Sequence, residues 1–247
     1  MEWTEEGIVL AARRHGEGAA IVSVITRGQG RYAGLVKGGA SRRQAGRFEP
    51  GNRVIATWRA RLEEHLGNFS CEPVASPSAL LFDKPLRLAA LTAATAVAES
   101  ALPEREPHPS VHDGLTRLID SLLADPDPVW QARYVRWEIA LLAELGFGLD
   151  LSRCAISGAR EGLAYVSPRT GRAATAEAGA LWKDQLFALP AFLATPGEAP
   201  SESAAATRLG LALTGHFLER HVFLNRPGGE PAARGRLIAR LMPGGSN

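Results

Sequence analysis

The stretch Ala19–Lys37, AAIVSVITRGQGRYAGLVK, decides the fold of the N-terminal part of the chain. It holds two runs rich in β-branched and aromatic residues, Ala19–Thr26 and Arg31–Lys37, on either side of Arg27-Gly28-Gln29-Gly30. Short connections that contain glycine commonly join antiparallel strands. The stretch therefore predicts a β-hairpin.

Similar runs precede and follow this hairpin, and we expect strands over Gly7–Ala12, Arg53–Ala60 and Leu66–Val74. In the run Arg53–Ala60, apolar residues alternate with polar and basic ones, which is typical of a half-buried strand. Trp58 has the apolar parity and is expected in the core. Five strands in such a short stretch predict a small closed barrel, a class that includes the OB-fold.

The pattern changes at Ser76-Pro77-Ser78, where Ala- and Leu-rich segments with a period near 3.6 begin. We expect helices over Pro85–Leu102, from Ser110 as N-cap to Asp125-Pro126, over Val129–Leu145 with Gly146 as its stop, over Ser201–Leu224 and over Ala232–Leu241. The sequence predicts an α+β protein with two domains: a five-stranded barrel over residues 1–77, and an all-α domain over residues 78–247. An irregular insertion, a short hairpin or zinc-knuckle-like segment, is expected at about 147–180.

The composition is that of a soluble globular protein, with 45% hydrophobic and 22% charged residues among 247. Cys71 and Cys154 lie far apart, which excludes a disulfide framework or zinc ribbon. The start MEWTEEG is acidic, where a secretory signal needs a basic segment and a long apolar run. No apolar stretch is long enough to span a membrane. We expect a cytoplasmic protein.

Common catalytic motifs are absent: the sequence has no GxxxxGK[ST], GxSxG, HExxH or paired CxxC. The glycines Gly28, Gly30 and Gly34 lack the spacing of a dinucleotide-binding loop, and a strand follows them where a helix should begin. His216 and His221 are five residues apart, so a helix directs them to different faces. We expect no enzymatic activity, no cofactor and no metal.

The positions of the charges are more informative than the net charge of +2. Residues 27–61 hold nine basic residues against one acid, Glu49, so this stretch carries +8 and the rest of the chain −6. Such a concentration of charge predicts a nucleic-acid site. The candidate DNA-binding residues are Arg27, Arg31, Lys37, Arg42, Arg43, Arg47, Arg59 and Arg61. Tyr32 and Phe48 are candidates for base stacking. Arg234, Arg236 and Arg240 either extend the path or are plain surface.

An ordered series of short motifs carries a family resemblance. It comprises Gly7-Ile8-Val9-Leu10, Thr26-x-x-x-Gly30-Arg31, Val36-Lys37-Gly38, Arg42-Arg43, Leu66-Gly67, Arg136-Trp137-Glu138-Ile139-Ala140-Leu141-Leu142-x-x-Leu145-Gly146-Phe147-Gly148 and Cys154-x-x-x-Gly158. The series resembles the RecO family of bacterial recombination mediators of the RecF pathway. The resemblance implies an N-terminal OB-fold, binding of single- and double-stranded DNA, strand annealing, and DNA repair in association with the nucleoid.

The resemblance also implies partners: RecR, the acidic C-terminal tail of single-stranded-DNA-binding protein (SSB), and a functional link to RecA and RecF. An acidic tail needs a cation beside an apolar pocket. Arg133 and Arg136, beside Trp137, meet that description, although ordinary salt bridges to Glu138 or Glu144 are an equal alternative. Some members of the family carry a four-cysteine zinc site, of which only Cys154 remains here.

Two other functions stay open. One is a non-catalytic adaptor whose basic barrel binds an acidic protein partner, and it predicts little affinity for oligonucleotides. The other is a nucleic-acid-processing enzyme with an unrecognised site, which predicts that DNA strands are altered on incubation.

Overall fold

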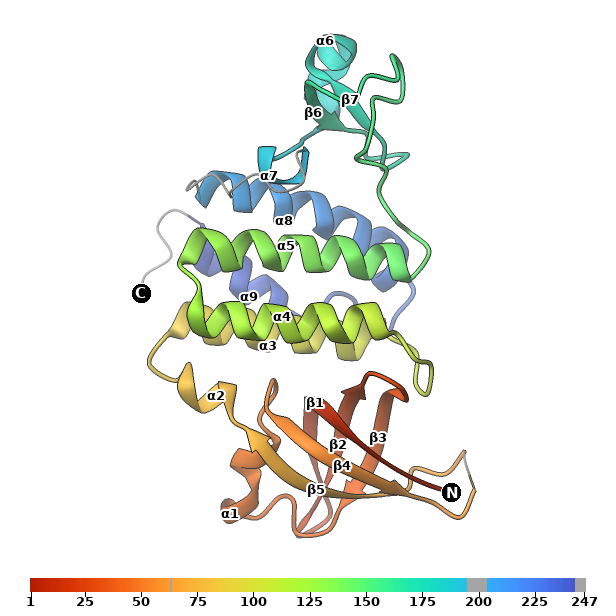
Figure 1. The fold of residues 1–247 in the computed structure, drawn as a ribbon, viewed down its shortest axis with the longest axis vertical. Coiled ribbons are helices and arrows are strands. Elements are labelled where there is room, and N and C mark those ends of the chain that lie inside the picture. Colours follow the sequence, from red (N-terminus) through yellow and green to blue (C-terminus); the bar gives the residue numbers. More distant parts are fainter. Residues whose placement is uncertain (63, 195–203, 243–247) are drawn as a thin grey trace. The chain divides into compact units, whose positions relative to one another are not determined.

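The computed structural model describes residues 1–62, 64–194 and 204–242. Its first five strands close a barrel in the order β1-β2-β3-β5-β4 (Figure 1). These strands are β1 (Glu2–His15), β2 (Ala19–Thr26), β3 (Gly30–Val36), β4 (Arg53–Arg59) and β5 (Asn68–Ala75). Their pairings are antiparallel except for the parallel contact of β3 with β5. The predicted five-stranded OB-fold barrel is confirmed.

The hairpin predicted from Ala19–Lys37 is present. β2 and β3 pair from Thr26 opposite Gly30 to Ala20 opposite Val36. Gly30 has φ +75°, a backbone conformation that residues with a Cβ rarely adopt. Gly34 lies inside β3, which excludes the alternative of a dinucleotide-binding loop.

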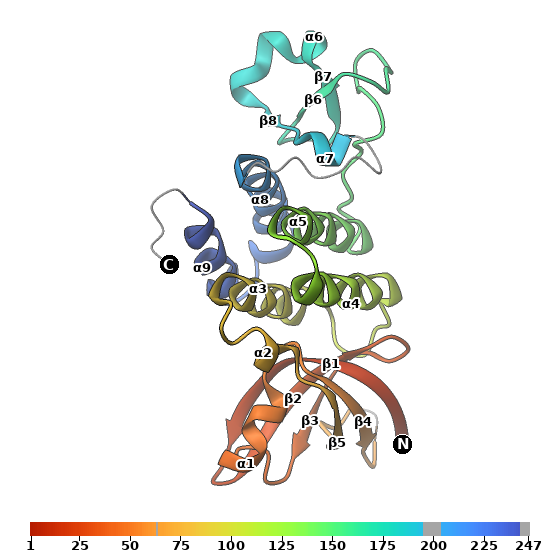
Figure 2. The same ribbon diagram turned by 60° about the vertical axis from the view of Figure 1, so that its left-hand side comes forward.

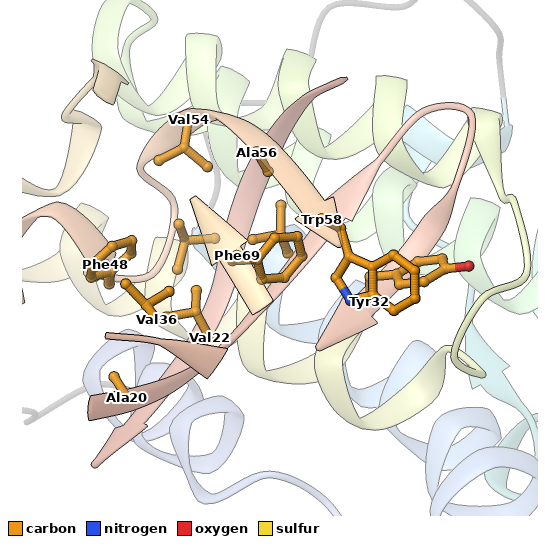
Figure 3. Close-up of a cluster of buried hydrophobic side chains, with 11 residues drawn as sticks. Ala20, Val22, Tyr32, Val36, Phe48, Val54, Ala56, Trp58 and Phe69 are labelled. Atoms are coloured by element: carbon orange, nitrogen blue, oxygen red, sulfur yellow. The ribbon is translucent and has the colours of Figure 1, made fainter. Parts of the chain in front are cut away.

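Alternate residues of the strands fill the barrel, as Figure 3 shows for Val22, Val54, Trp58 and Phe69. Trp58 is 1% exposed, as expected from its parity, and its Nε1 donates a 3.0 Å hydrogen bond to the carbonyl oxygen of Leu66. The buried indole therefore has its polar atom satisfied, which removes the cost of burying it.

One compact unit comprises Met1–Leu123 and Pro231–Leu237, so it holds the barrel and the helices that follow it. These are α2 (Pro77–Leu80), α3 (Pro85–Ala101) and α4 (Pro109–Ala124); α3 and α4 lie side by side (Figure 2). Helix α4 begins at Pro109 rather than after an N-cap at Ser110, because proline is well tolerated in a first turn. The domain boundary after residue 77 stays a prediction.

The second compact unit comprises Ala124–Glu230 and, among the described residues, 238–242. Its longest helix, α5 (Asp127–Glu144), begins within the Asp-Pro repeat that we expected to precede it, because Pro128 occupies the first turn. Gly146 follows with φ +86°, as expected for a helix stop. Helix α9 (Ala232–Leu241) has the predicted bounds and is shared between the units.

Helix α8 (Ala204–Leu218) packs on α5 and continues into the π-helical turn η3 (Glu219–Phe223). Leu213 and Phe217 are buried as predicted, but Leu209 is 44% exposed, so its place on the buried stripe was wrong. The predicted start at Ser201 lies outside the described residues.

The insertion contains a small sheet in the order β7-β6-β8. Its elements are β6 (Leu163–Val166), β7 (Ala173–Thr175), α6 (Ala176–Gly179), η2 (Ala180–Gln185) and β8 (Phe187–Ala188), followed by α7 (Ala191–Ala194). The hairpin alternative for this segment is confirmed. Among the described helices, none is long and apolar enough to cross a membrane.

Candidate nucleic-acid interface

Four cations share the connection between β3 and β4, residues 37–52, which we call the basic loop. Lys37, Arg42, Arg43 and Arg47 are exposed. The loop contains the short helices α1 (Arg42–Ala45) and η1 (Gly46–Phe48). Within the described part of the chain, none of these four side chains forms an ion pair or hydrogen bond. The structure therefore gathers four predicted DNA-binding residues on one loop.

The basic loop is held to the barrel by Asn52, which is 1% exposed. Its Nδ2 donates hydrogen bonds to the carbonyl oxygens of Gly46 at 2.9 Å and Arg47 at 3.4 Å. Its Oδ1 accepts a 2.8 Å hydrogen bond from Ser78 Oγ. The neighbouring Gly51 has φ +89°, and a Cβ there would lie 2.4 Å from Leu91. Sequence reasoning missed Asn52, because nothing in its local pattern shows that its amide turns inward.

The pairing of the strands brings two further cations to this site, which the charge count over residues 27–61 did not include. Arg14 of β1 lies opposite Ala20 of β2, which in turn lies opposite Val36, the residue before Lys37. Arg13 and Arg14 therefore lie at the same end of the barrel as the start of the basic loop, and both are exposed. The predicted first strand ended at Ala12, whereas β1 runs from Glu2 to His15, so the prediction left both arginines outside the barrel.

A cleft of about 570 Å³ lies in the first compact unit beside the basic loop. Four arginines line it: Arg13, Arg14, Arg42 and Arg236. Arg236 is exposed on α9 and is one of the three C-terminal arginines considered as an extension of the site. Arg234 is 1% exposed and is not available to a ligand.

Arg31 does not belong to this interface. Its Nε donates to the carbonyl oxygen of Leu102 at 3.0 Å, and its Nη1 lies 3.3 Å from carboxylate oxygens of Glu99 and Glu104. The side chain is only 13% exposed. The prediction that Arg31 contacts phosphate was wrong, because this guanidinium joins β3 to the end of α3.

Three other basic residues of the barrel also have acidic partners. Arg27 pairs with Asp113 at 3.2 Å, Arg53 with Asp120 at 2.6 Å and Arg59 with Glu2 at 2.7 Å. The Arg59 hydrogen bond lowers the pKa of the Glu2 carboxyl. The side chains of Arg27 and Arg59 are 62% and 68% exposed, so phosphate can compete for them only against these carboxylates.

Arg61 is exposed, and its side chain has no partner among the described residues. It lies in the β4–β5 connection, on a different loop from the other unpaired cations.

The predicted base-stacking residues are buried. Tyr32 is 6% exposed, and its ring packs edge-on against Trp58 with centroids 5.2 Å apart (Figure 3). Phe48 is 3% exposed and anchors the basic loop in the barrel core. Neither ring offers a free face to a base, so both predictions were wrong. Their apolar bodies contribute more in the core than at a wet surface.

The predicted site for the SSB tail is not formed. Trp137 is 3% exposed. Arg136 donates a 2.7 Å hydrogen bond to the carbonyl oxygen of Phe192 and lies over the Phe192 ring. Arg133 forms its ion pair with Asp125, at 3.8 Å, and not with Glu138 or Glu144, the two partners considered in the sequence analysis. The apolar stripe beside these arginines is buried in the second unit, so it forms no open pocket next to them, and binding of the tail at Arg133 stays a prediction.

The two cysteines have opposite environments. Burial raises the pKa of the Cys71 thiol to about 12. Cys154 is buried, and hydrogen bonds, chiefly those from Ser157, lower its pKa to about 6. Across residues 1–62, 64–194 and 204–242, no three His, Cys, Asp or Glu side chains lie close enough to hold a metal ion. The donors around Cys154 therefore do not fit a zinc site.

Comparison with known proteins identifies the family. Residues 1–77 match the model described as Recombination protein O N terminal, and residues 83–228 match Recombination protein O C terminal. Proteins named DNA repair protein RecO are similar over nearly the whole chain. One from Rhodospirillum rubrum is 51% identical over 98% of this chain and 96% of its own. One from Rhodospirillum centenum is 52% identical over 97% and 94%. One from Phenylobacterium zucineum is 51% identical over 99% of each chain. The chain therefore belongs to the RecO family of DNA repair and recombination proteins.

Proposed function

We propose that this protein is a recombination mediator that binds single- and double-stranded DNA, anneals complementary strands and, with RecR, helps load RecA on SSB-coated DNA. One observation carries the DNA-binding part of the proposal. Seven exposed cations without partners in the described chain lie on the basic loop, the neighbouring end of β1 and the cleft beside them: Arg13, Arg14, Lys37, Arg42, Arg43, Arg47 and Arg236.

The charge arrangement suits annealing without catalysis. Two DNA strands repel each other, and cations that neutralise phosphates reduce that repulsion and release condensed counterions. This process breaks no covalent bond, so it needs neither a nucleophile nor a metal. The function is therefore binding rather than enzymatic, and we expect the protein in the cytoplasm with the nucleoid, where RecF-pathway partners act.

A second cleft, in the other compact unit, supports binding of the acidic SSB tail. Its volume is about 530 Å³, and its lining combines two arginines with apolar side chains: Arg169, Arg172, Ile156, Pro168, Trp182 and Leu186. Arg172 lies 3.8 Å from Asp150, so Arg169 is the cation that we assign to the tail. Ile156 is 64% and Trp182 49% exposed. A terminal carboxylate can pair with a guanidinium while adjacent apolar side chains of the tail cover the indole.

The alternative is an adaptor whose basic surface binds an acidic protein. One experiment separates the alternatives: labelled single-stranded DNA is titrated at several salt concentrations, while annealing and strand integrity are followed in the same samples. A mediator binds with a slope near −0.7 for each phosphate neutralised, accelerates annealing and leaves the strands intact.

Absent or salt-independent binding would favour the adaptor and contradict the mediator. Shortened or chemically altered strands would instead show a nucleic-acid-processing enzyme.

A further inference from the structure

We propose that the cleft beside the basic loop holds one unpaired nucleotide, so that the protein prefers single-stranded to fully paired DNA. This inference rests on the proposed DNA-binding function and assigns a specific ligand to a specific cavity. The cleft volume of about 570 Å³ lies within the usual range of about 300–1,000 Å³ for small-ligand sites.

The cations of the cleft come from three separate parts of the chain. Arg13 and Arg14 belong to the end of β1, Arg42 to the basic loop and Arg236 to α9. Within the described chain none of their side chains has an acidic partner. A guanidinium group matches the geometry of a phosphate, so these arginines provide contacts for the phosphates that flank one nucleotide.

The rest of the lining is mainly small and apolar. Leu10 and Ala20 contribute from the barrel strands, Ala40 and Pro50 from the basic loop, and Ala96 and Ala233 from helices α3 and α9. A lining of this kind favours the flat apolar face of a base over a hydrated phosphate. Small side chains also keep the cleft open, which a ring needs to enter.

Two acidic residues, Glu49 and Glu99, line the cleft, and the charge of Glu99 is balanced by an arginine. The carboxylate of Glu99 accepts hydrogen bonds from Ser23 and from Arg31. Glu49 is exposed and has no cationic partner in the described chain. Four arginines against one unpaired carboxylate leave the cleft with a positive charge, as a nucleotide requires.

Strand preference follows from the geometry. A base within a duplex is stacked and paired, and it must leave the helix before it can enter the cleft, which costs a few kcal/mol. A base in a single strand enters without that cost. Duplex DNA therefore uses the basic loop alone, whereas a single strand uses the loop and the cleft.

The test fills the cleft without changing its charge. In the full chain, Ala96→Phe places a ring in the lining, and Ala79→Phe, at an exposed position of α2 outside the cleft, is the matched control. Affinity for oligothymidine and for a blunt duplex is measured, together with the emission of an oligonucleotide that carries one fluorescent base analogue. Ala96→Phe is expected to weaken single-strand binding about tenfold, to leave duplex binding unchanged and to abolish the change in emission.

A second variant guards against a packing defect in the first. Arg236→Ala truncates an exposed side chain and is expected to lower single-strand affinity selectively. If both variants keep the ratio of single-strand to duplex affinity of the unmodified protein, the cleft does not hold a base and the inference is overturned. If the unmodified protein binds neither DNA, the proposed function itself fails, and the site fails with it.

Discussion

The side-chain Nδ2 of Asn52 donates a 2.9 Å hydrogen bond to the carbonyl oxygen of Gly46. Asn52 is buried at the end of the basic loop, directly before β4, and Gly46 lies in the middle of the loop. One amide thereby fixes the loop, while its Oδ1 accepts from Ser78 at the beginning of α2. The position of the exposed cations depends on a residue that carries no charge.

A substitution of Asn52 tests how much its hydrogen bonds to the loop contribute, without changing any cation of the loop. Asn52→Asp keeps the size of the side chain but replaces the donor with a carboxylate that faces two carbonyl oxygens. The free energy of unfolding is expected to fall by about 1–3 kcal/mol, as for a buried group left unsatisfied. Urea denaturation measures the change. The control Ser78→Ala removes only the hydroxyl donor and should cost less; an equal decrease in both variants would show that the hydrogen bonds to the loop contribute nothing.

The ion pair of Arg31 with Glu99 is expected to stabilise the first unit rather than bind DNA. Their side chains are 13% and 16% exposed, so Arg31→Ala leaves a poorly solvated carboxylate and should cost about 3 kcal/mol, the lower end for a broken buried pair. Arg31→Met with Glu99→Met should recover much of that stability. A double variant as unstable as the single one, or a reduced salt dependence of DNA binding in Arg31→Met with Glu99→Met, would contradict this role.

The Cys154 thiol predicts a pH dependence. Its pKa of about 6 in the folded chain lies below the ordinary value of 9.0, so ionisation stabilises the fold. This contribution is fully present above pH 9 and is lost as the pH falls through 6. Thiolate absorbance in the ultraviolet should therefore titrate near pH 6, and Cys154→Ala should remove that step. Cys71, with a pKa of about 12, should not contribute there. A first thiolate step near pH 9 would contradict the hydrogen-bonded thiolate.

The acidic-tail site is tested by comparing two arginines. Arg169→Ala or Trp182→Ala in the 530 Å³ cleft should weaken binding of a peptide with the SSB tail sequence about tenfold or more, as for a paired cation or a buried aromatic anchor. Arg133→Ala, beside the buried Trp137, is the matched control and should leave binding unchanged. If Arg133→Ala alone weakens binding, the tail occupies another surface.

The sequence predicted the barrel well because its signals are local. The alternation of Val54, Ala56 and Trp58 and the hairpin after Thr26 depend on neighbouring residues only. The helix stop at Gly146 is of the same kind. Leu209 was misplaced because a periodic pattern does not show which of two apolar stripes meets a neighbour.

The interface was only partly predictable, because pairing between distant residues decides which cations are free. Arg27 and Arg31 form ion pairs with acidic residues of helices α4 and α3, which lie far along the chain. Arg43 and Arg47 have no partner in the described chain. The aromatic ring of Tyr32 is of a type that can stack on bases, but Tyr32 occupies a position of β3 whose side chain faces the barrel core.

The central claim is that the basic loop binds phosphates, and the salt dependence of single-strand binding tests it most directly. Arg42→Gln with Arg43→Gln removes two exposed charges of the loop. The control, Arg117→Gln with Arg160→Gln, removes two exposed charges elsewhere, so it has the same net charge as the loop variant. The loop variant should reduce the slope of log K against log salt concentration by about 1.4, or about 0.7 for each phosphate that is no longer neutralised, while the control keeps the slope of the unmodified protein. Equal slopes in all three proteins would contradict the account.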